Sequence, residues 1–266
     1  MKGSGKLLCW RTKADNPLVD LARGKLLLER ASSGGCVFSW AVWPESALVL
    51  GYGQEATGAY NEAFCRASSV SVLRRRTGGS GVLVDGDMVL SLAIPSAIPA
   101  AKTIGRTYDL FVDSTREALL RLGLETHRWK AEGCASRERS KICFENQLTE
   151  SLLIDGKKVM GCSQARVAGA VLIHAVLMLG LDVEKQAGVF GVDRKRIEKA
   201  LSYVSLYDLS PMELLPETLS EVLGEKLNLE VGGWEEPPVL PERLAEESHG
   251  PKWKVLPQQV FSADTG

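Results

Sequence analysis

The spacing of apolar and polar residues predicts short strands interleaved with longer helices. Apolar residues recur at helical intervals over residues 16–31, 59–67, 113–122, 184–201 and 211–229. Short runs rich in Val, Leu and aromatic residues predict strands over residues 36–42, 47–51, 69–73, 82–84, 87–94, 151–154 and 158–162. Two Asp-Gly pairs, residues 85–86 and 155–156, are expected to close hairpins between neighbouring strands.

These elements do not alternate strictly as strand, helix, strand. Together with the two hairpins they predict an α+β fold with a mixed, largely antiparallel sheet flanked by helices. A doubly wound nucleotide-binding sheet is disfavoured, because the chain has neither G-x-G-x-x-G after its first strand nor G-x-x-x-x-G-K-[ST]. We expect one domain over residues 1–231, followed by a Pro-rich arm over residues 232–266.

Charge and hydropathy narrow the classes of partner. The 266 residues carry a formal net charge of -1, which argues against global attraction to nucleic acid or to an anionic membrane. The longest apolar run, residues 167–181, includes His174 and is shorter than the roughly 20 residues of a spanning helix. The first residues lack the apolar core of a signal peptide, so a cytoplasmic location is expected.

The cysteines do not have the spacing of a metal site. None forms a C-x-x-C pair or has a histidine at a ligand spacing, so no metal is expected. In a reducing compartment each thiol would be a small buried apolar group unless its surroundings activate it. The six are Cys9, Cys36, Cys65, Cys134, Cys143 and Cys162.

Two segments carry candidate chemistry. Residues 74–81, RRRTGGSG, place arginines before a glycine-rich turn whose amides can approach a carbonyl or an anion closely. Taken alone, this string is equally typical of a basic surface turn. Residues 141–166 contain Cys143 and Lys158. A thiol that meets a lysine ammonium is a good nucleophile for thioester chemistry, and the lysine could also stabilise an oxyanion.

Four motifs, in order along the chain, resemble those of the lipoate–protein ligase and octanoyltransferase superfamily. Residues 74–79 match R-R-x-T-G-G, residues 156–166 match G-x-K-[VI]-x-G-x-x-Q-x-R, residues 51–54 match G-x-x-Q, and residues 170–179 resemble L-x-H-G-x-L-L. The resemblance implies the catalytic-domain fold of that superfamily. It also implies a substrate-binding set of Arg75, Thr77, Gly78, Gly79, Asp85, Gly161, Gln164 and His174.

Two further segments resemble the cysteine-dependent octanoyltransferases. Residues 84–91 are closer to their H-D-x-E-L-T-Y-S pattern than to the H-D-x-G-N of ligases, and residues 143–145 resemble their C-F-[DE]. The resemblance implies that Cys143 and Lys158 are catalytic. The reaction it implies moves an octanoyl group from acyl carrier protein to a lysine of a lipoyl domain, in glycine-cleavage H protein or a dehydrogenase E2 subunit, without a cofactor.

Other functions stay open at this point. An ATP-dependent lipoate ligase would form a lipoyl-adenylate with ATP and Mg²⁺, although the residues after 182 leave little room for the extra domain of such ligases. A non-catalytic protein that binds acyl chains or lipoyl domains is the third reading. It is motivated by Val84, which stands where the family has histidine.

Three smaller expectations complete the sequence analysis. Cys162 is a rival nucleophile to Cys143. Trp40 and Trp43 are expected in the core rather than against an acyl chain. The charged run at residues 137–139 is expected on a surface loop and could dock an acidic carrier protein.

Overall fold

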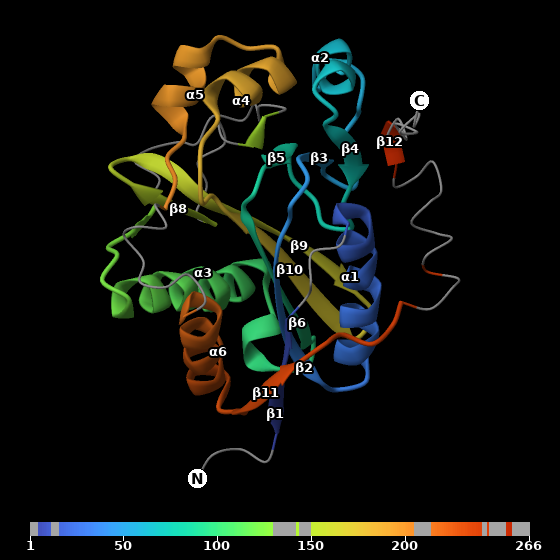
Figure 1. The fold of residues 1–266 in the computed structure, drawn as a ribbon. Coiled ribbons are helices and arrows are strands. Elements are labelled where there is room, and N and C mark those ends of the chain that lie inside the picture. Colours follow the sequence, from blue (N-terminus) through green and yellow to red (C-terminus); the bar gives the residue numbers. More distant parts are fainter. Residues whose placement is uncertain are drawn as a thin grey trace, which may run out of the picture.

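The computed structural model describes residues 5–11, 16–129, 142–143, 150–204, 214–240, 244 and 254–256 (Figure 1). Cys134, the run at residues 137–139 and the predicted start of a helix at residue 211 lie outside these ranges.

An eight-stranded sheet forms the centre of the fold, in the order β11-β1-β2-β6-β10-β9-β8-β7. β1 pairs in parallel with β11 and β2, and every other pair in this sheet is antiparallel. The mixed, largely antiparallel sheet expected from the sequence is therefore confirmed. Its strands are β1 (Lys6–Arg11), β2 (Cys36–Val42), β6 (Met88–Pro95), β7 (His127–Arg128), β8 (Ser151–Ile154), β9 (Lys157–Val167), β10 (Ala170–Leu177) and β11 (Glu230–Glu235).

A second, four-stranded sheet has the order β12-β4-β3-β5. β3 and β4 are parallel, whereas β12 and β5 join the edges antiparallel. Its strands are β3 (Ala47–Leu50), β4 (Ser71–Arg74), β5 (Val82–Val84) and β12 (Lys254–Leu256).

The two Asp-Gly pairs have different outcomes. Asp155 and Gly156 both have positive φ and close the β8–β9 hairpin, as predicted. The hairpin predicted at residues 85–86 is wrong, because β5 pairs with β3 in the small sheet while β6 pairs with β2 and β10 in the large one. An Asp-Gly pair signals where the chain turns but does not say which strand the next segment will meet.

The helices cover both faces of the large sheet and one end of the molecule (Figure 1). α1 packs on one face of the large sheet, and α3 and α6 pack on the other. α2, α4 and α5 share a core cluster with the small sheet. Their bounds are α1 (Pro17–Ser32), α2 (Glu62–Ala67), α3 (Ile104–Arg121), α4 (Val183–Phe190), α5 (Arg194–Ala200) and α6 (Leu214–Leu227), with a 3₁₀ turn at Pro99–Ala101. No helix of the described ranges is long and apolar enough to cross a membrane.

The N-terminus of α1 shows how the sequence sets a helix start. The side chain of Asn16 accepts a hydrogen bond from the Leu18 N–H, and Pro17 occupies the first helical position. Leu28 of α1 then packs with Leu172 of β10, whereas the next residue, Ile173, faces the core under α3 and α6. This alternation places His174 on the α1 face of the sheet.

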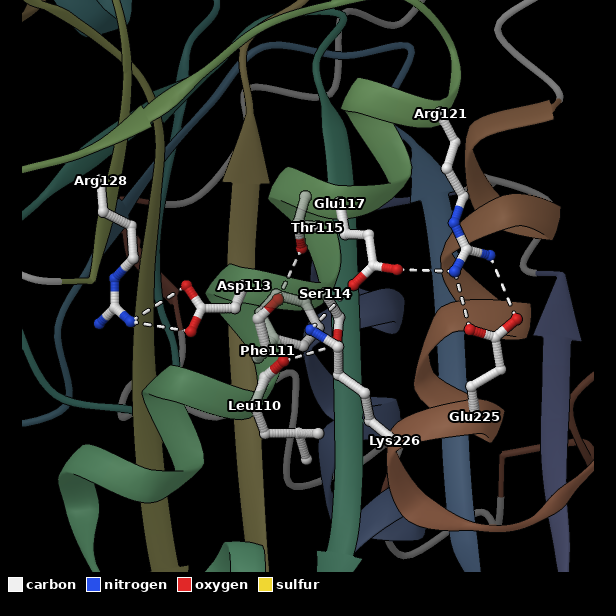
Figure 2. A network of polar contacts seen from close by, with 10 residues as sticks. All are labelled: Leu110, Phe111, Asp113, Ser114, Thr115, Glu117, Arg121, Arg128, Glu225 and Lys226. Carbon is white, nitrogen blue, oxygen red and sulfur yellow. Dashed lines mark hydrogen bonds and ion pairs between the residues drawn. The ribbon is translucent and has the colours of Figure 1, made fainter. Parts of the chain in front are cut away.

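Surface ion pairs connect α3 to its neighbours (Figure 2). Arg121 pairs with Glu117 of its own helix and with Glu225 of α6, and Arg128 of β7 reaches back to Asp113. These side chains are partly exposed, so each pair contributes at most about 1 kcal/mol. Apolar burial between the helices and the sheet therefore accounts for most of the packing energy.

Some elements carry no strong local signal. The sequence analysis did not predict β1, β11 or the first half of α3. The domain boundary that it placed after Val231 lies inside β11. β1 lies between two parallel partners from distant parts of the chain. Such pairing depends on long-range contacts rather than on a neighbouring turn.

Candidate functional site

A cavity of about 460 Å³ lies between the two sheets. This volume falls within the range usual for small-molecule sites. One part of its wall is apolar and belongs to a single core cluster, formed by Leu21, Trp43, Val49, Val84, Val89 and Val176. Another part is polar and includes Arg75, Cys143, Lys158, Ser163, Gln164 and His174.

Cys143 and Lys158 meet in the polar part. Lys158 Nζ is 3.6 Å from Cys143 Sγ and donates a hydrogen bond of 3.2 Å to the Cys143 carbonyl. The backbone holds both residues, because the Cys143 N–H donates to Gly81 and the Lys158 carbonyl accepts from Ser202, each at 3.0 Å. A buried ammonium at this position can stabilise a thiolate and an oxyanion formed beside it.

Gly161 leaves the space that this contact needs. A Cβ at position 161 would lie 2.7 Å from Lys158 Cε and 3.7 Å from Cys143 Sγ. A larger residue would therefore push the lysine away from the sulfur. The structure places Gly161 in the site as a spacer, which is consistent with the position that the family motif gives it.

The rival cysteine is in a different environment. Cys162 Sγ donates to the Glu150 carbonyl at 3.3 Å, and burial raises the pKa of its thiol. Burial also raises the pKa of Cys9, Cys36 and Cys65 to about 11. Of the cysteines in the described ranges, Cys143 is the one that Lys158 contacts.

Arg75 organises the glycine turn. Its guanidinium donates to the carbonyls of Val49, Gly78 and Ser80 and to Ser163 Oγ, at distances of 2.6–3.1 Å. Burial lowers the pKa of this group. Arg75 also lines the cavity, and the substrate contact that the resemblance implies for it stays a prediction.

Glycine is required at one position of the turn and at one position that faces it. Gly79 has φ +91°, which disfavours other residues, and a Cβ at position 51 would overlap the Gly79 carbonyl. The G-x-x-Q element and the R-R-x-T-G-G turn of this chain therefore depend on each other's shape. Their physical link is a backbone contact between two distant segments.

Thr77 and Gln164 fasten the turn to neighbouring elements. Thr77 Oγ1 lies 2.7 Å from Ser163 Oγ, and the Gly78 N–H meets the Gln164 carbonyl at 3.5 Å. The Gln164 side chain donates to the Ile104 carbonyl of α3 at 3.0 Å. Gln164, Gly78 and Gly79 line the cavity, whereas Thr77 is fully buried behind it.

His174 is a neutral group in the cavity wall. Only 7% of it is exposed, and burial together with Arg75 and Arg76 lowers its pKa to about 3. Its Nδ1 has no hydrogen-bond partner within the part of the chain that the structure describes. The ring therefore does not supply a positive charge near neutral pH.

Asp85 does not reach the cavity. Its carboxylate pairs with Lys185 of α4 at 2.9 Å and accepts a hydrogen bond from Ser46. Asp85 thus ties α4 to the link between the two sheets, and a substrate contact at this residue stays a prediction.

Sequence reasoning missed the contribution of Trp43 to the site. Trp43 is buried as expected, but it also lines the cavity, and its Nε1 donates to Asp20 of α1 at 2.9 Å. Val84, in place of the family histidine, lies in the same apolar wall. No local pattern marks either residue as cavity-lining, because the cavity forms only when the two sheets meet.

The buried carboxyl group of Asp87 should make the stability of the protein depend on pH. Its carboxylate accepts from the Leu179 and Asp85 N–H groups, and burial raises its pKa from 3.8 to about 6. Between these two pH values the folded protein keeps the Asp87 proton that the unfolded chain has already lost. The stability that protonated Asp87 contributes below pH 4 is therefore lost as the pH rises through 6. Relative to Asp87→Asn, the wild-type free energy of unfolding should fall by about 3 kcal/mol over this interval.

Denaturant unfolding of both proteins at several pH values between 3.5 and 7 tests this expectation. The difference between the two free energies is the relevant quantity, because it removes the contribution of every other titrating group. A difference that does not change with pH would contradict the raised pKa of Asp87.

The fold and site together define a class of protein. It is an α+β domain in which a partly apolar cavity borders a thiol and an ammonium. Residues 16–226 match the lipoyl protein ligase A/B catalytic domain, and the chain belongs to this family.

Relatives and solved structures agree with this assignment. The octanoyltransferase LipM of Macrococcus caseolyticus is 25% identical over 80% of this chain and 83% of its own. That of Carboxydothermus hydrogenoformans is 31% identical over 66% of this chain and 65% of its own. A bi-partite lipoate protein ligase from Thermoplasma acidophilum has the same fold, with a TM-score of 0.74 and 20% identity over 96% of this chain and 98% of its own.

Proposed function

We propose that the protein transfers an octanoyl or similar medium-chain acyl group from acyl carrier protein to a lysine of a lipoyl domain. The observation that carries this proposal is the contact between Cys143 and Lys158 at the cavity. The relatives named octanoyltransferase LipM support it.

The donor half-reaction forms an acyl-enzyme. The Cys143 thiolate attacks the carbonyl carbon of the carrier thioester, and the Lys158 ammonium donates to the resulting oxyanion. Collapse of this intermediate breaks the bond to the carrier sulfur and leaves the acyl group on Cys143. The apolar wall formed by Trp43, Val84 and their neighbours would hold the chain.

The acceptor half-reaction removes the acyl group from Cys143 and regenerates the free enzyme. The ε-amine of the acceptor lysine attacks the acyl-Cys143 carbonyl, an amide forms, and the cysteine thiolate leaves. The proton lost by the amine balances the one taken up by the carrier thiolate. Transfer from a thioester to an amide is downhill, so the proposal requires neither ATP nor a metal.

Mass spectrometry of the acyl-enzyme tests the mechanism. After incubation with octanoyl carrier protein, the wild type should carry a hydroxylamine-labile octanoyl adduct, and Cys143→Ala should carry none. Cys162→Ser is the matched control, because it removes the neighbouring thiol, and it should retain the adduct. If Cys143→Ala carried the adduct and Cys162→Ser did not, the nucleophile would be Cys162 instead.

The same incubation separates the alternative functions. A requirement for ATP with release of pyrophosphate would indicate a lipoate ligase, in which Lys158 would contact the adenylate. Binding of acyl chains or lipoyl domains without turnover would indicate a non-catalytic protein. The length of this chain does not distinguish a transferase from a ligase, because its fold covers 98% of a chain of the bi-partite lipoate protein ligase.

A further inference from the structure

Gln186 of α4 is a buried polar side chain that the acyl-transfer mechanism does not use. It is 4% exposed and lines the cavity. Its backbone N–H donates to the Asp182 carbonyl at 3.0 Å, and its side-chain amide has no hydrogen-bond partner among the described residues. The cavity lining also includes Leu83, Met178, Phe190 and Leu201, which are apolar and belong to the core cluster under α4 and α5.

The strand β10 shows where Gln186 lies along the cavity. His174 and Val176 line the cavity from β10, and Met178 lines it just beyond the strand end. At about 3.3 Å per residue, these positions extend over roughly 13 Å. His174 is paired with Ser163, next to the glycine turn, whereas Met178 shares a cluster with Phe190. Phe190 follows Gln186 by one turn of α4, so Gln186 lies toward the end of the cavity away from the glycine turn.

The reactive pair lies between these two ends. Gly161, whose vacant Cβ position faces both Cys143 Sγ and Lys158, is paired with Val176. A chain attached to Cys143 could thus extend along the apolar wall toward Gln186. The amide would then meet the distal part of the chain rather than its carbonyl.

The energetics of a buried amide decide what chain fits there. Covering an amide with a plain alkyl chain removes it from water without supplying a hydrogen bond, at a cost equivalent to a factor of about 5 to 150 in binding. A hydroxyl or carbonyl oxygen at this position would satisfy the amide, because a primary amide both donates and accepts.

We propose that Gln186 selects an acyl chain that carries a hydroxyl or oxo group in its distal half. The inference rests on the proposed acyl transfer and narrows its substrate class. His174 supplies no equivalent contact, because it lies at the glycine-turn end of the cavity. Lys185, the neighbour of Gln186, does not compete for the chain, since it pairs with Asp85 outside the cavity.

Paired donor substrates test the proposal. Octanoyl and 8-hydroxyoctanoyl thioesters of the carrier protein would be compared by kcat/KM for the wild type, Gln186→Leu and Gln186→Met. The wild type should prefer the hydroxylated chain by about 5-fold or more, and both variants should shift the ratio toward octanoyl by about 10-fold or more. Met178→Leu is the matched control, because it alters the shape of the same wall without changing its polarity and should affect both donors alike.

The outcomes separate this inference from the proposed function. If transfer occurs with a ratio that neither Gln186 variant changes, the inference is wrong while acyl transfer stands. If no donor is transferred, calorimetric binding of octanoic and 8-hydroxyoctanoic acid to the same proteins takes its place. A Gln186-dependent binding ratio would then support the inference without the enzyme activity, whereas an unchanged ratio or no binding would overturn it.

Discussion

Replacement of Lys158 by methionine is expected to slow acyl-enzyme formation by about 10²–10³-fold, the usual effect of removing one donor to an oxyanion. Lys158 Nζ lies 3.6 Å from the Cys143 sulfur, so the ammonium faces the place where negative charge develops. Methionine fills the same volume without this charge. Single-turnover measurements with octanoyl carrier protein would give the acylation rate directly.

The same substitution should leave the protein folded. Lys158 is only 6% exposed, and burial of an ammonium costs free energy that an apolar side chain does not incur. The melting temperature of Lys158→Met should therefore equal or exceed that of the wild type. Lys157→Met, at the exposed neighbouring position, should change neither rate nor stability. Loss of activity accompanied by unfolding would argue for a structural role of Lys158 instead.

Replacement of Arg75 by methionine should lower the free energy of unfolding by about 3–5 kcal/mol, because three carbonyls and a hydroxyl would lose their donor. These groups belong to Val49, Gly78, Ser80 and Ser163. Arg75→Lys should recover only part of the loss, since an ammonium cannot reproduce the fork of the guanidinium. Chemical denaturation of the three proteins would measure the effect.

An exposed arginine provides the control for Arg75. Arg194 of α5 is more than half exposed and pairs with Glu184 and Glu198 on the surface, so Arg194→Met should leave the free energy of unfolding nearly unchanged. Equal effects of the two substitutions would contradict the role assigned to Arg75. Its role is to hold the glycine turn in place, and the acylation rate of Arg75→Lys should consequently fall along with its stability.

Much of the fold followed from local patterns, for reasons visible in single elements. α1 is set by the Asn16 cap and the proline after it, and β8 and β9 by the Asp155-Gly156 turn. Each involves residues that are neighbours in the chain. The hairpin expected at Asp85-Gly86 failed because the partner of β5 is β3, which precedes it in the chain by more than thirty residues.

The departure at Val84 becomes intelligible only in three dimensions. In the sequence, Val84 replaces the histidine of the family, which suggests that ligand contacts made by that histidine are lost. In the structure, Val84 is fully buried and packs with Val49, Val89 and Trp43 in the wall of the cavity. The substitution therefore extends the apolar surface available to a ligand. This is compatible with a protein that still binds an acyl chain.

The sequence by itself determined the α+β class, the segments that turn and the pairing of Cys143 with Lys158 as candidates, because these depend on local periodicity and on ordered motifs. Only the tertiary structure decided the contacts of individual side chains. It assigned Arg75 to the turn and Asp85 to an ion pair with Lys185, and it brought Trp43 and Gln186 to the cavity. The physical reason is that a cavity wall is assembled from distant segments, and the burial and hydrogen bonding of each wall residue depend on neighbours that local sequence does not specify.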